Sequence, residues 1–225
     1  MQDIFAEEFQ PKRIIDNPSE EKLREWALEQ GGIITEFGNL SVVTAVRNRI
    51  AKFTEVVTGE LDQEDMELVH SVMEYLRTKE MIMLDRVMCH TPGFKRNCRL
   101  YVTADYPRLP LMWGNTLFLP DGGEPDFVAI MVPEWKEKKT LVFPESGLTL
   151  IMGSDYKGEN KKAMLRQVMY WAKQQGNLGL HAASKIMRVY RDGKLRISAF
   201  FSLVSAPRVR PLFPAIPTGY APRRG

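Results

Sequence analysis

The sequence joins a strand to a helix in one short stretch, LTLIMGSDYKGENKK (residues 148–162). The apolar run 148–152 is typical of a buried strand, and it ends at Gly153. A helix is expected from about residue 159 to residue 175, because apolar side chains recur there at helical spacing: Met164, Leu165, Val168, Met169 and Ala172. A strand that leads into an amphipathic helix predicts a sheet with helices packed against it.

The rest of the chain extends this pattern. Asn17 is placed to cap a first helix with Pro18 in its first turn, and a second helix begins near Asp62. The signal Arg191-Asp192-Gly193 predicts a hairpin between the last two strands. Strand-like runs cover 32–37, 40–46, 81–84, 98–103, 111–118, 127–132, 140–143, 148–152, 186–190 and 195–203. Strands outnumber helices and do not alternate strictly with them, so we expect an α+β (mixed α/β) fold, a mixed sheet with packed helices.

The composition is that of a globular protein, with 44% hydrophobic and 26% charged residues in a length of 225. We expect one domain over residues 1–205 and an irregular, Pro/Arg-rich tail over 206–225. No apolar run is long enough for a membrane span, and the acidic start does not resemble a signal peptide. Cys89 and Cys98 form no metal motif. A cytoplasmic protein that does not act at a membrane is therefore expected.

The net charge of +3 comes from the tail. Residues 206–225 contain four arginines and no acidic residue, and the remainder of the chain has 27 basic against 28 acidic side chains. A nearly neutral body without a basic patch argues against a nucleic-acid partner. Binding of nucleic acid through the arginine tail remains an alternative, which salt-dependent binding lost on deletion of 206–225 would favour.

Candidate site residues gather where the helix of the opening stretch begins. Tyr156, Lys161 and Lys162 lie near its amino end, where free backbone amides and lysine charge favour a carboxylate or phosphate. A solvated lysine pair on a surface helix is the simpler interpretation, and spacing alone favours it. His181 precedes a strand and is followed by small residues, and Arg47 could hold a dicarboxylate. From the local sequence alone, the favoured interpretations are a structural or surface histidine for His181 and a charged loop between two strands for Arg47.

Several segments, in the same order, resemble ATP-dependent phosphoenolpyruvate carboxykinases. That family carries Gly-Thr-x-Tyr-x-Gly-Glu-Met-Lys-Lys, and residues 153–162 here read Gly-Ser-Asp-Tyr-Lys-Gly-Glu-Asn-Lys-Lys. Weaker matches are Pro-Asp-Phe-Val at 125–128, the degraded arginine segment at 46–53, Leu-His-Ala-Ala-Ser-Lys at 180–185 and Phe-Phe at 200–201. The resemblance covers roughly residues 17–203, and the lysine motif is its most specific part.

The resemblance implies a carboxy-lyase reaction of gluconeogenesis, in which oxaloacetate and ATP give phosphoenolpyruvate, carbon dioxide and ADP with Mn²⁺ or Mg²⁺. It implies that Arg47 holds the oxaloacetate carboxylate and that Tyr156 lines the same pocket. By the same resemblance Lys162 and His181 bind the metal, and Lys161 faces the transferring phosphoryl group. The implied partner is a small dicarboxylate or phosphoenolpyruvate. The sequence does not indicate an oligomeric state.

The sequence departs from the family where ATP should bind. In the family, Phe-Phe leads into Gly-x-Ser-Gly-Thr-Gly-Lys-Thr, whose amides and lysine hold the triphosphate. Here Phe201 is followed by Ser-Leu-Val-Ser-Ala-Pro-Arg-Val-Arg-Pro, so the cofactor loop is absent and we expect this chain to be inactive alone. The alternative is a non-catalytic module of the same fold that binds a small anion or a protein.

The tail suggests why the loop is missing. When each codon is read from the last base of one residue and the first two of the next, residues 207–224 can encode Thr-Gly-Lys-Thr-Thr-Leu-Ser-Cys-His-Thr-His-Arg-Leu-Cys-Ala-Glu-Glu-Gly. The first six residues of this translation are the second half of the missing loop. Our hypothesis is a frameshift, in the gene or in its reading, that puts the last 20 or so residues out of frame.

Overall fold

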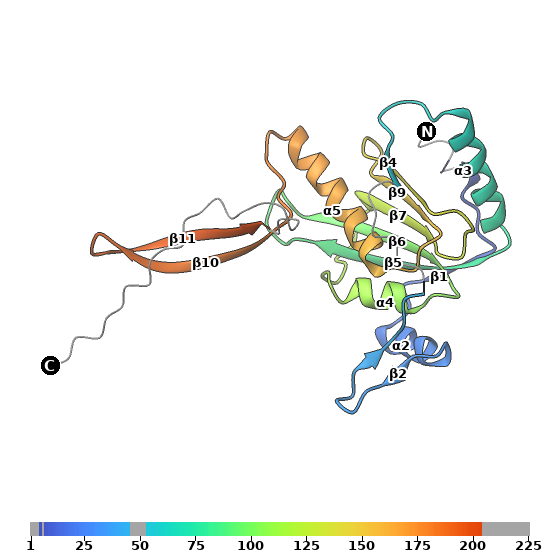
Figure 1. Ribbon diagram of the computed structural model, residues 1–225, viewed down its shortest axis with the longest axis horizontal. Coiled ribbons are helices and arrows are strands. Elements are labelled where there is room, and N and C mark those ends of the chain that lie inside the picture. Colours follow the sequence, from blue (N-terminus) through green and yellow to red (C-terminus); the bar gives the residue numbers. More distant parts are fainter. Residues whose placement is uncertain (1–4, 6, 46–52, 204–225) are drawn as a thin grey trace. The chain divides into compact units, whose positions relative to one another are not determined.

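The computed structural model describes residue 5, residues 7–45 and residues 53–203 of the chain (Figure 1). The chain divides into two compact units, residues 1–179 and residues 180–225. The tail 206–225 lies outside the described residues, so the domain boundary expected at 205 stays a prediction.

The first unit is built on a mixed sheet, which confirms the predicted fold class. In the described residues the sheet has seven strands in the order β1-β5-β6-β7-β9-β8-β4. The pairs β5–β6 and β8–β9 are antiparallel, and the other neighbours are parallel. The strands are β1 (Arg13–Asp16), β4 (Thr54–Val56), β5 (Glu80–Met88), β6 (Arg96–Thr103), β7 (Phe127–Val132), β8 (Lys139–Phe143) and β9 (Leu148–Met152).

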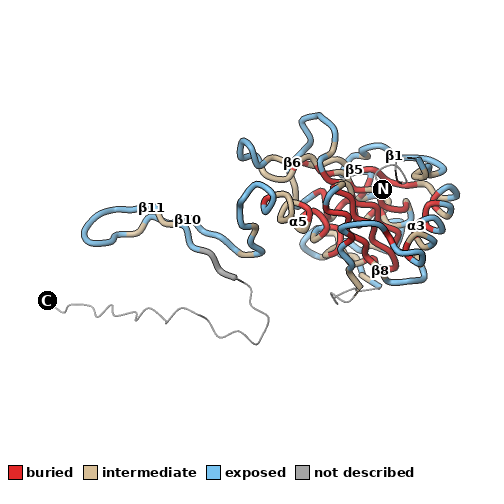
Figure 2. The backbone as a smooth tube through the Cα atoms, turned by 90° about the horizontal axis from the view of Figure 1, so that it is seen from above, coloured by how far each residue is buried: buried red, intermediate tan, exposed pale blue. Residues whose placement is uncertain are grey.

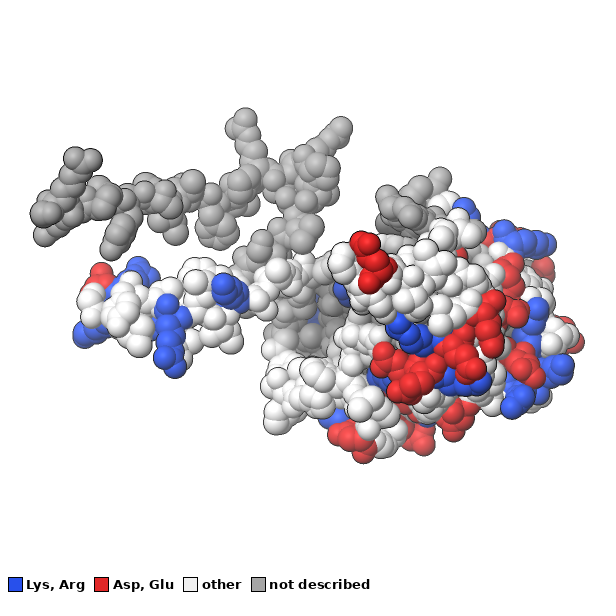
Figure 3. Space-filling model, turned by 90° about the horizontal axis from the view of Figure 1, so that it is seen from below, with Lys and Arg blue, Asp and Glu red and all other residues white. Residues whose placement is uncertain are grey.

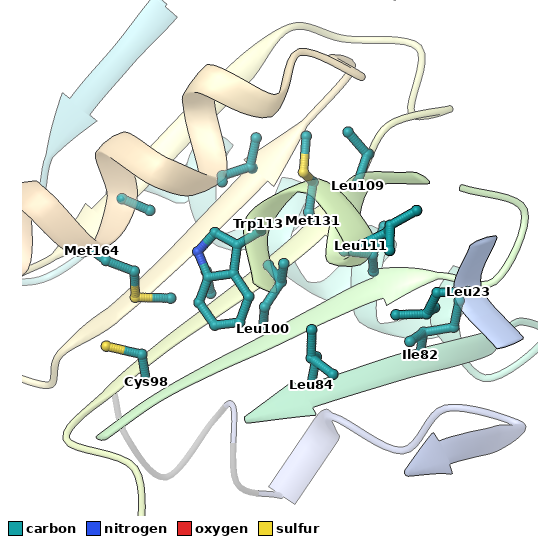
Figure 4. Close-up of a cluster of buried hydrophobic side chains, with 14 of the residues drawn as sticks. Leu23, Ile82, Leu84, Cys98, Leu100, Leu109, Leu111, Trp113, Met131 and Met164 are labelled. Carbon is teal, nitrogen blue, oxygen red and sulfur yellow. The ribbon is translucent and has the colours of Figure 1, made fainter. Parts of the chain in front are cut away.

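Helices cover both faces of this sheet. One face carries α2 (Glu20–Glu29), α4 (Arg108–Gly114) and α5 (Lys157–Gln174), and the other carries α3 (Gln63–Leu76). Successive strand residues point to opposite faces, so Ile151 of β9 packs with α5 whereas Leu150 and Met152 pack in the α3 cluster. Figure 2 shows that the buried residues concentrate in the sheet. Figure 4 shows Trp113 of α4 inside the buried cluster on the face that carries α2, α4 and α5. Burial on both faces explains the nearly continuous apolar runs of β7 and β9.

The sequence predicted the start of α3 correctly but predicted the wrong capping residue for α2. Helix α3 starts at Gln63, as predicted, and Asp62 caps it: the Asp62 carboxylate accepts from the Asp65 amide. The prediction that Asn17 caps α2 was wrong, because Ser19 accepts from the Lys22 amide instead. Asn17 has a positive φ of 43°, and its side-chain oxygen accepts from the Asp85 amide of β5 at 2.8 Å. Asn17 therefore joins the chain before α2 to the sheet.

The predicted strand 111–118 was wrong. Residues 108–114 form helix α4, with Pro107 at its amino-terminal cap and Leu109, Leu111 and Trp113 buried. A short apolar run does not distinguish a buried strand from a buried helix, and the prolines at 107 and 110 suit a first helical turn. The runs 32–37 and 40–46 form only the short pair β2 (Ile33–Ile34) and β3 (Leu40–Ser41), with residue 46 outside the described part. Strands β1 and β4 had not been predicted.

The second unit contains the predicted hairpin. Strands β10 (Ala182–Arg191) and β11 (Lys194–Leu203) pair antiparallel, and Asp192 and Gly193 turn the chain with φ values of 53° and 73°. Directly opposed residues share a face, so the register places four exposed apolar side chains on the same side as Arg188: Ile186, Tyr190, Leu195 and Ile197. The other side carries basic residues, among them Lys185, Arg191, Lys194 and Arg196.

The surface of the first unit carries both signs of charge. On the face shown in Figure 3, acidic and basic side chains lie next to one another over the described residues of this unit. None of the helices in the described part of the chain is long and apolar enough to cross a membrane. Both cysteines are free thiols, and burial raises the pKa of Cys98 to about 12, which keeps this thiol protonated and unreactive.

We predict that a chain ending at Gly179 unfolds cooperatively, with a midpoint close to that of the 225-residue chain. Both buried clusters lie within residues 1–179, so removal of the second unit takes no side chain from them. Thermal unfolding followed by circular dichroism checks this. A chain ending at Tyr156 is the matched control, because it loses Ala163 and Met164 from the core and should not fold. Loss of cooperative unfolding in the longer truncation would show that the hairpin or the tail is structural.

Candidate functional site

The turn between β9 and α5 forms the centre of the site. Gly153 has a φ of 66°, and a Cβ atom there would lie 2.2 Å from the Glu137 carbonyl oxygen. Glycine is therefore required for the chain to leave β9 so close to the strand connection. The two residues that follow, Ser154 and Asp155, are buried, and Tyr156 stands at the amino-terminal cap position of α5. The predicted strand-to-helix junction is confirmed, with α5 beginning at Lys157.

Asp155 joins three separate segments at this turn. Its side chain is 3% exposed, and its carboxylate accepts from the guanidinium of Arg108 in α4 and from the Ala45 amide at 2.8 Å. The ion pair compensates the cost of burying the carboxylate. Ala45 lies two residues before Arg47 in sequence, so the segment that leads to the predicted arginine is anchored beside Tyr156. Arg47 itself lies outside the described residues.

Tyr156 and Lys162 lie together at the start of α5. The Tyr156 ring packs against Gly158, where an added Cβ would come within 2.3 Å of Cε1 of the ring. A side chain at residue 158 would therefore displace the tyrosine. The Lys162 ammonium lies 5.8 Å from the centroid of the same ring, a cation–π distance. The spacing Tyr-x-Gly and the lysine six residues after the tyrosine thus describe one compact cluster over the first turns of α5.

The buried carboxylate of Glu159 forms ion pairs with Lys162 of this cluster and with Arg166. Its side chain is 3% exposed, and its two carboxylate oxygens accept from Lys162 Nζ at 2.6 Å and from Arg166 Nη2 at 3.3 Å. Sequence reasoning assigned no role to Glu159, Arg166, Asp155 or Arg108. The three-residue spacing of Glu159 and Lys162 on a helix was the available signal. The pairing of Asp155 with Arg108 had no local signal.

The other predicted residues are placed separately. Lys161 is exposed on α5, next to Lys162 in sequence but on a different side of the helix, because successive helical residues diverge by about 100°. His181 is exposed and belongs to the second unit. The structure therefore brings Tyr156 and Lys162 together and leaves the expected closeness of His181 and Lys162 a prediction.

The electrostatics of the turn suit an anion more than a metal ion. Asp155 and Glu159 are both matched by cationic partners, whereas Lys161 adds exposed positive charge near the amino end of α5. Among the described residues no group of three or more histidine, cysteine, aspartate or glutamate side chains is arranged to hold a metal. Lys162 would have to leave Glu159 and lose its proton before Nζ could coordinate one. The described side chains at this turn do not by themselves fit a metal ion.

Comparison with known proteins identifies the family. The family model for phosphoenolpyruvate carboxykinase, ATP type, matches residues 12–206 of the chain. The chain belongs to this family. The matched residues include the described strands of the main sheet, the β9–α5 turn and the hairpin.

Two curated relatives are phosphoenolpyruvate carboxykinases (ATP). The protein of Aeropyrum pernix is 33% identical over 184 residues, which cover 80% of this chain and 37% of that protein. The glycosomal protein of Trypanosoma brucei brucei is 27% identical over 200 residues, which cover 73% of this chain and 42% of that protein. The chain thus spans about two-fifths of the length of the carboxykinases it matches.

One buried residue departs from the carboxykinase motif quoted above, which has methionine where this chain has Asn160. Asn160 is fully buried in the first turns of α5, and among the described residues neither its amide nitrogen nor its amide oxygen has a hydrogen-bond partner. An unsatisfied buried amide costs free energy, so an apolar residue should be preferred at this position.

We predict that Asn160→Leu stabilises the chain by about 1 to 2 kcal/mol, because leucine keeps the branched shape and removes two unsatisfied polar atoms. The free energy of unfolding from urea titration measures the effect. Gln174→Leu, at an exposed position of the same helix, is the control and should change little. Destabilisation by Asn160→Leu would mean that the amide has partners that this structure does not reveal.

We predict that Glu159→Gln destabilises the chain by about 2 kcal/mol, because Lys162 and Arg166 would keep their charge beside a neutral, buried amide. The magnitude is below that of a fully buried pair, since both cationic partners reach solvent. The matched control is Glu145→Gln in the exposed turn after β8, expected to stay within about 0.5 kcal/mol of the parent. Equal unfolding free energies for the two variants would remove Glu159 from its structural role.

Proposed function

We propose that this chain forms the part of an ATP-dependent phosphoenolpyruvate carboxykinase that binds oxaloacetate or phosphoenolpyruvate. The observation that supports this most is the folding of the family motif 153–162 into one compact cluster. In this cluster, Tyr156 packs on Gly158, and the Lys162 ammonium donates a hydrogen bond to the Glu159 carboxylate at the start of α5. A helix amino end with adjacent lysines is suited to carboxylate and phosphate groups.

The proposed roles follow the resemblance and the positions of the side chains. Tyr156 forms a wall of the substrate pocket, and Lys161, exposed beside the helix start, faces the phosphoryl group. Arg47 holds the substrate carboxylate from the segment that Ala45 anchors to Asp155. Lys162 and His181 are proposed as metal-contacting residues on resemblance alone, because Lys162 is engaged by Glu159. A divalent metal in this family would stabilise negative charge on the substrate oxygen.

We propose that the phosphoryl-transfer half of the site is incomplete in this sequence. No glycine-rich loop with a lysine follows Phe201, so a triphosphate has no amide cradle in this sequence. We propose that the shifted reading of residues 207–224 restores part of that loop, and that a frameshift accounts for the tail. A cytoplasmic location is part of the same proposal; the trypanosome relative is named as glycosomal.

A second candidate is a non-catalytic module with the same fold that binds a small anion or a protein. The closed Lys162–Glu159 pair favours it, because a lysine already neutralised by a buried carboxylate needs no metal to be stable. Binding of phosphoenolpyruvate without turnover agrees with either candidate, whereas turnover after restoration of the loop supports the enzyme alone.

We predict that the 225-residue chain makes no phosphoenolpyruvate from oxaloacetate and ATP, and that a gene restored to the other reading frame does. A coupled assay for phosphoenolpyruvate with Mn²⁺ and Mg²⁺ present measures both. In the restored protein, Lys161→Met should lower kcat by about 100-fold or more, because a charge near the transferring group is lost. Lys173→Met, near the carboxyl end of the same helix, is the matched control and should retain activity. ATP-dependent turnover by the 225-residue chain would contradict the proposal.

A further inference from the structure

A cavity lies away from the β9–α5 turn. Its volume is about 300 Å³, and it opens on the α3 face of the sheet at the amino ends of β7 and β9. Val128 and Leu148, which pair in register, form its floor, whereas the turn at Gly153 follows the other end of β9. This volume is at the lower end of the range of about 300 to 1,000 Å³ that is typical of small-molecule sites. The cavity is therefore independent of the proposed carboxykinase site.

Three aromatic rings line this cavity. Phe5 and Phe9 come from the chain before β1, and Tyr101 comes from β6. Phe9 contacts Tyr101 edge to face with ring centroids 4.8 Å apart, and Phe5 contacts Phe143 in the same way at 5.4 Å. These contacts hold the two phenylalanine rings against the sheet. The faces and edges of the rings that line the cavity favour contact with another aromatic ring. A flat aromatic ring is the complementary shape and chemistry.

The polar end of the cavity consists of donors that are already fixed in place. Arg99 is bound to Asp85 through Nε–Oδ1 at 2.7 Å and Nη2–Oδ2 at 3.0 Å, and Asn17 also donates to Asp85. The bidentate pair orients the guanidinium and cancels its charge. Arg99 also interacts with the Tyr101 hydroxyl, so the guanidinium and the phenol form one polar group at this end of the cavity. Burial raises the pKa of Tyr101, so its hydroxyl remains protonated and able to donate.

We propose that this cavity binds a small aromatic molecule that carries one hydrogen-bond acceptor, such as the carbonyl of an aromatic amide. The ring lies between Phe5, Phe9 and the β7–β9 floor, and the acceptor meets the donors of Arg99 and Tyr101. Because Asp85 balances Arg99, recognition depends on the acceptor more than on net negative charge. Few polar groups converging in an apolar cavity are the usual features of such sites.

The test uses the full 225-residue chain and benzamide as the probe, with acetamide as the probe that lacks the ring. We expect saturable benzamide binding with a Kd on the order of 1 mM, measured by nuclear magnetic resonance titration, and no saturable binding of acetamide. Val128→Phe, which fills the cavity, should abolish binding, and Tyr101→Phe should weaken it by about tenfold. Val56→Phe, at an exposed position of β4, is the matched control. Circular dichroism confirms that each variant folds.

Several results would overturn the proposal. Absence of benzamide binding to the parent chain is one, and equal binding by the parent and the folded Val128→Phe variant is another. Equal binding of acetamide and benzamide would show that the ring is not recognised. If Val128→Phe fails to fold, the Tyr101→Phe comparison decides, and unchanged affinity there overturns the proposal.

Discussion

The left-handed turn at Gly153 is the constraint on which the site depends. Because a Cβ atom would meet the Glu137 carbonyl at 2.2 Å, only glycine lets the chain pass this point and return as α5 over the sheet. That return places Ala163 and Met164 in the core. The same geometry presents the first turns of α5, with Tyr156, Lys161 and Lys162, at the carboxyl end of β9. A packing requirement and the position of the functional motif therefore have one origin.

Buried carboxylates connect the layers that surround this turn. Asp155 binds Arg108 of α4, and Glu159 binds Lys162 and Arg166 within α5. On the other face, Asp65 of α3 binds Lys139 of β8, which also approaches Glu55 of β4 at 3.2 Å. Each buried charge needs its partner, because a lone buried ion costs several kcal/mol. The Asp155–Arg108 and Asp65–Lys139 pairs therefore restrict how α4 and α3 sit on the sheet, whereas the Glu159 pairs fix Lys162 over the first turns of α5.

The second unit follows a different principle. Its two strands bury little, and Ile186, Tyr190 and Ile197 are each at least 75% exposed along one face. An isolated two-stranded hairpin is marginally stable in water, so its pairing depends on turn chemistry at Asp192 and Gly193. His181 lies directly before the first strand of this hairpin.

The sequence alone determined the features that depend on local periodicity. Strands β7 and β9, the start of α3 near Asp62 and the hairpin turn all follow from neighbours within a few residues. The apolar run at 111–118 led to a wrong strand prediction, because a buried strand and a short buried helix give the same apolar run in the sequence. Tertiary structure alone decided that β9 lies between β7 and β8 and that Asp155 meets Arg108, 47 residues away. The sequence shows no periodic pattern for such contacts, because they depend on how the packed layers bring distant segments of the chain together.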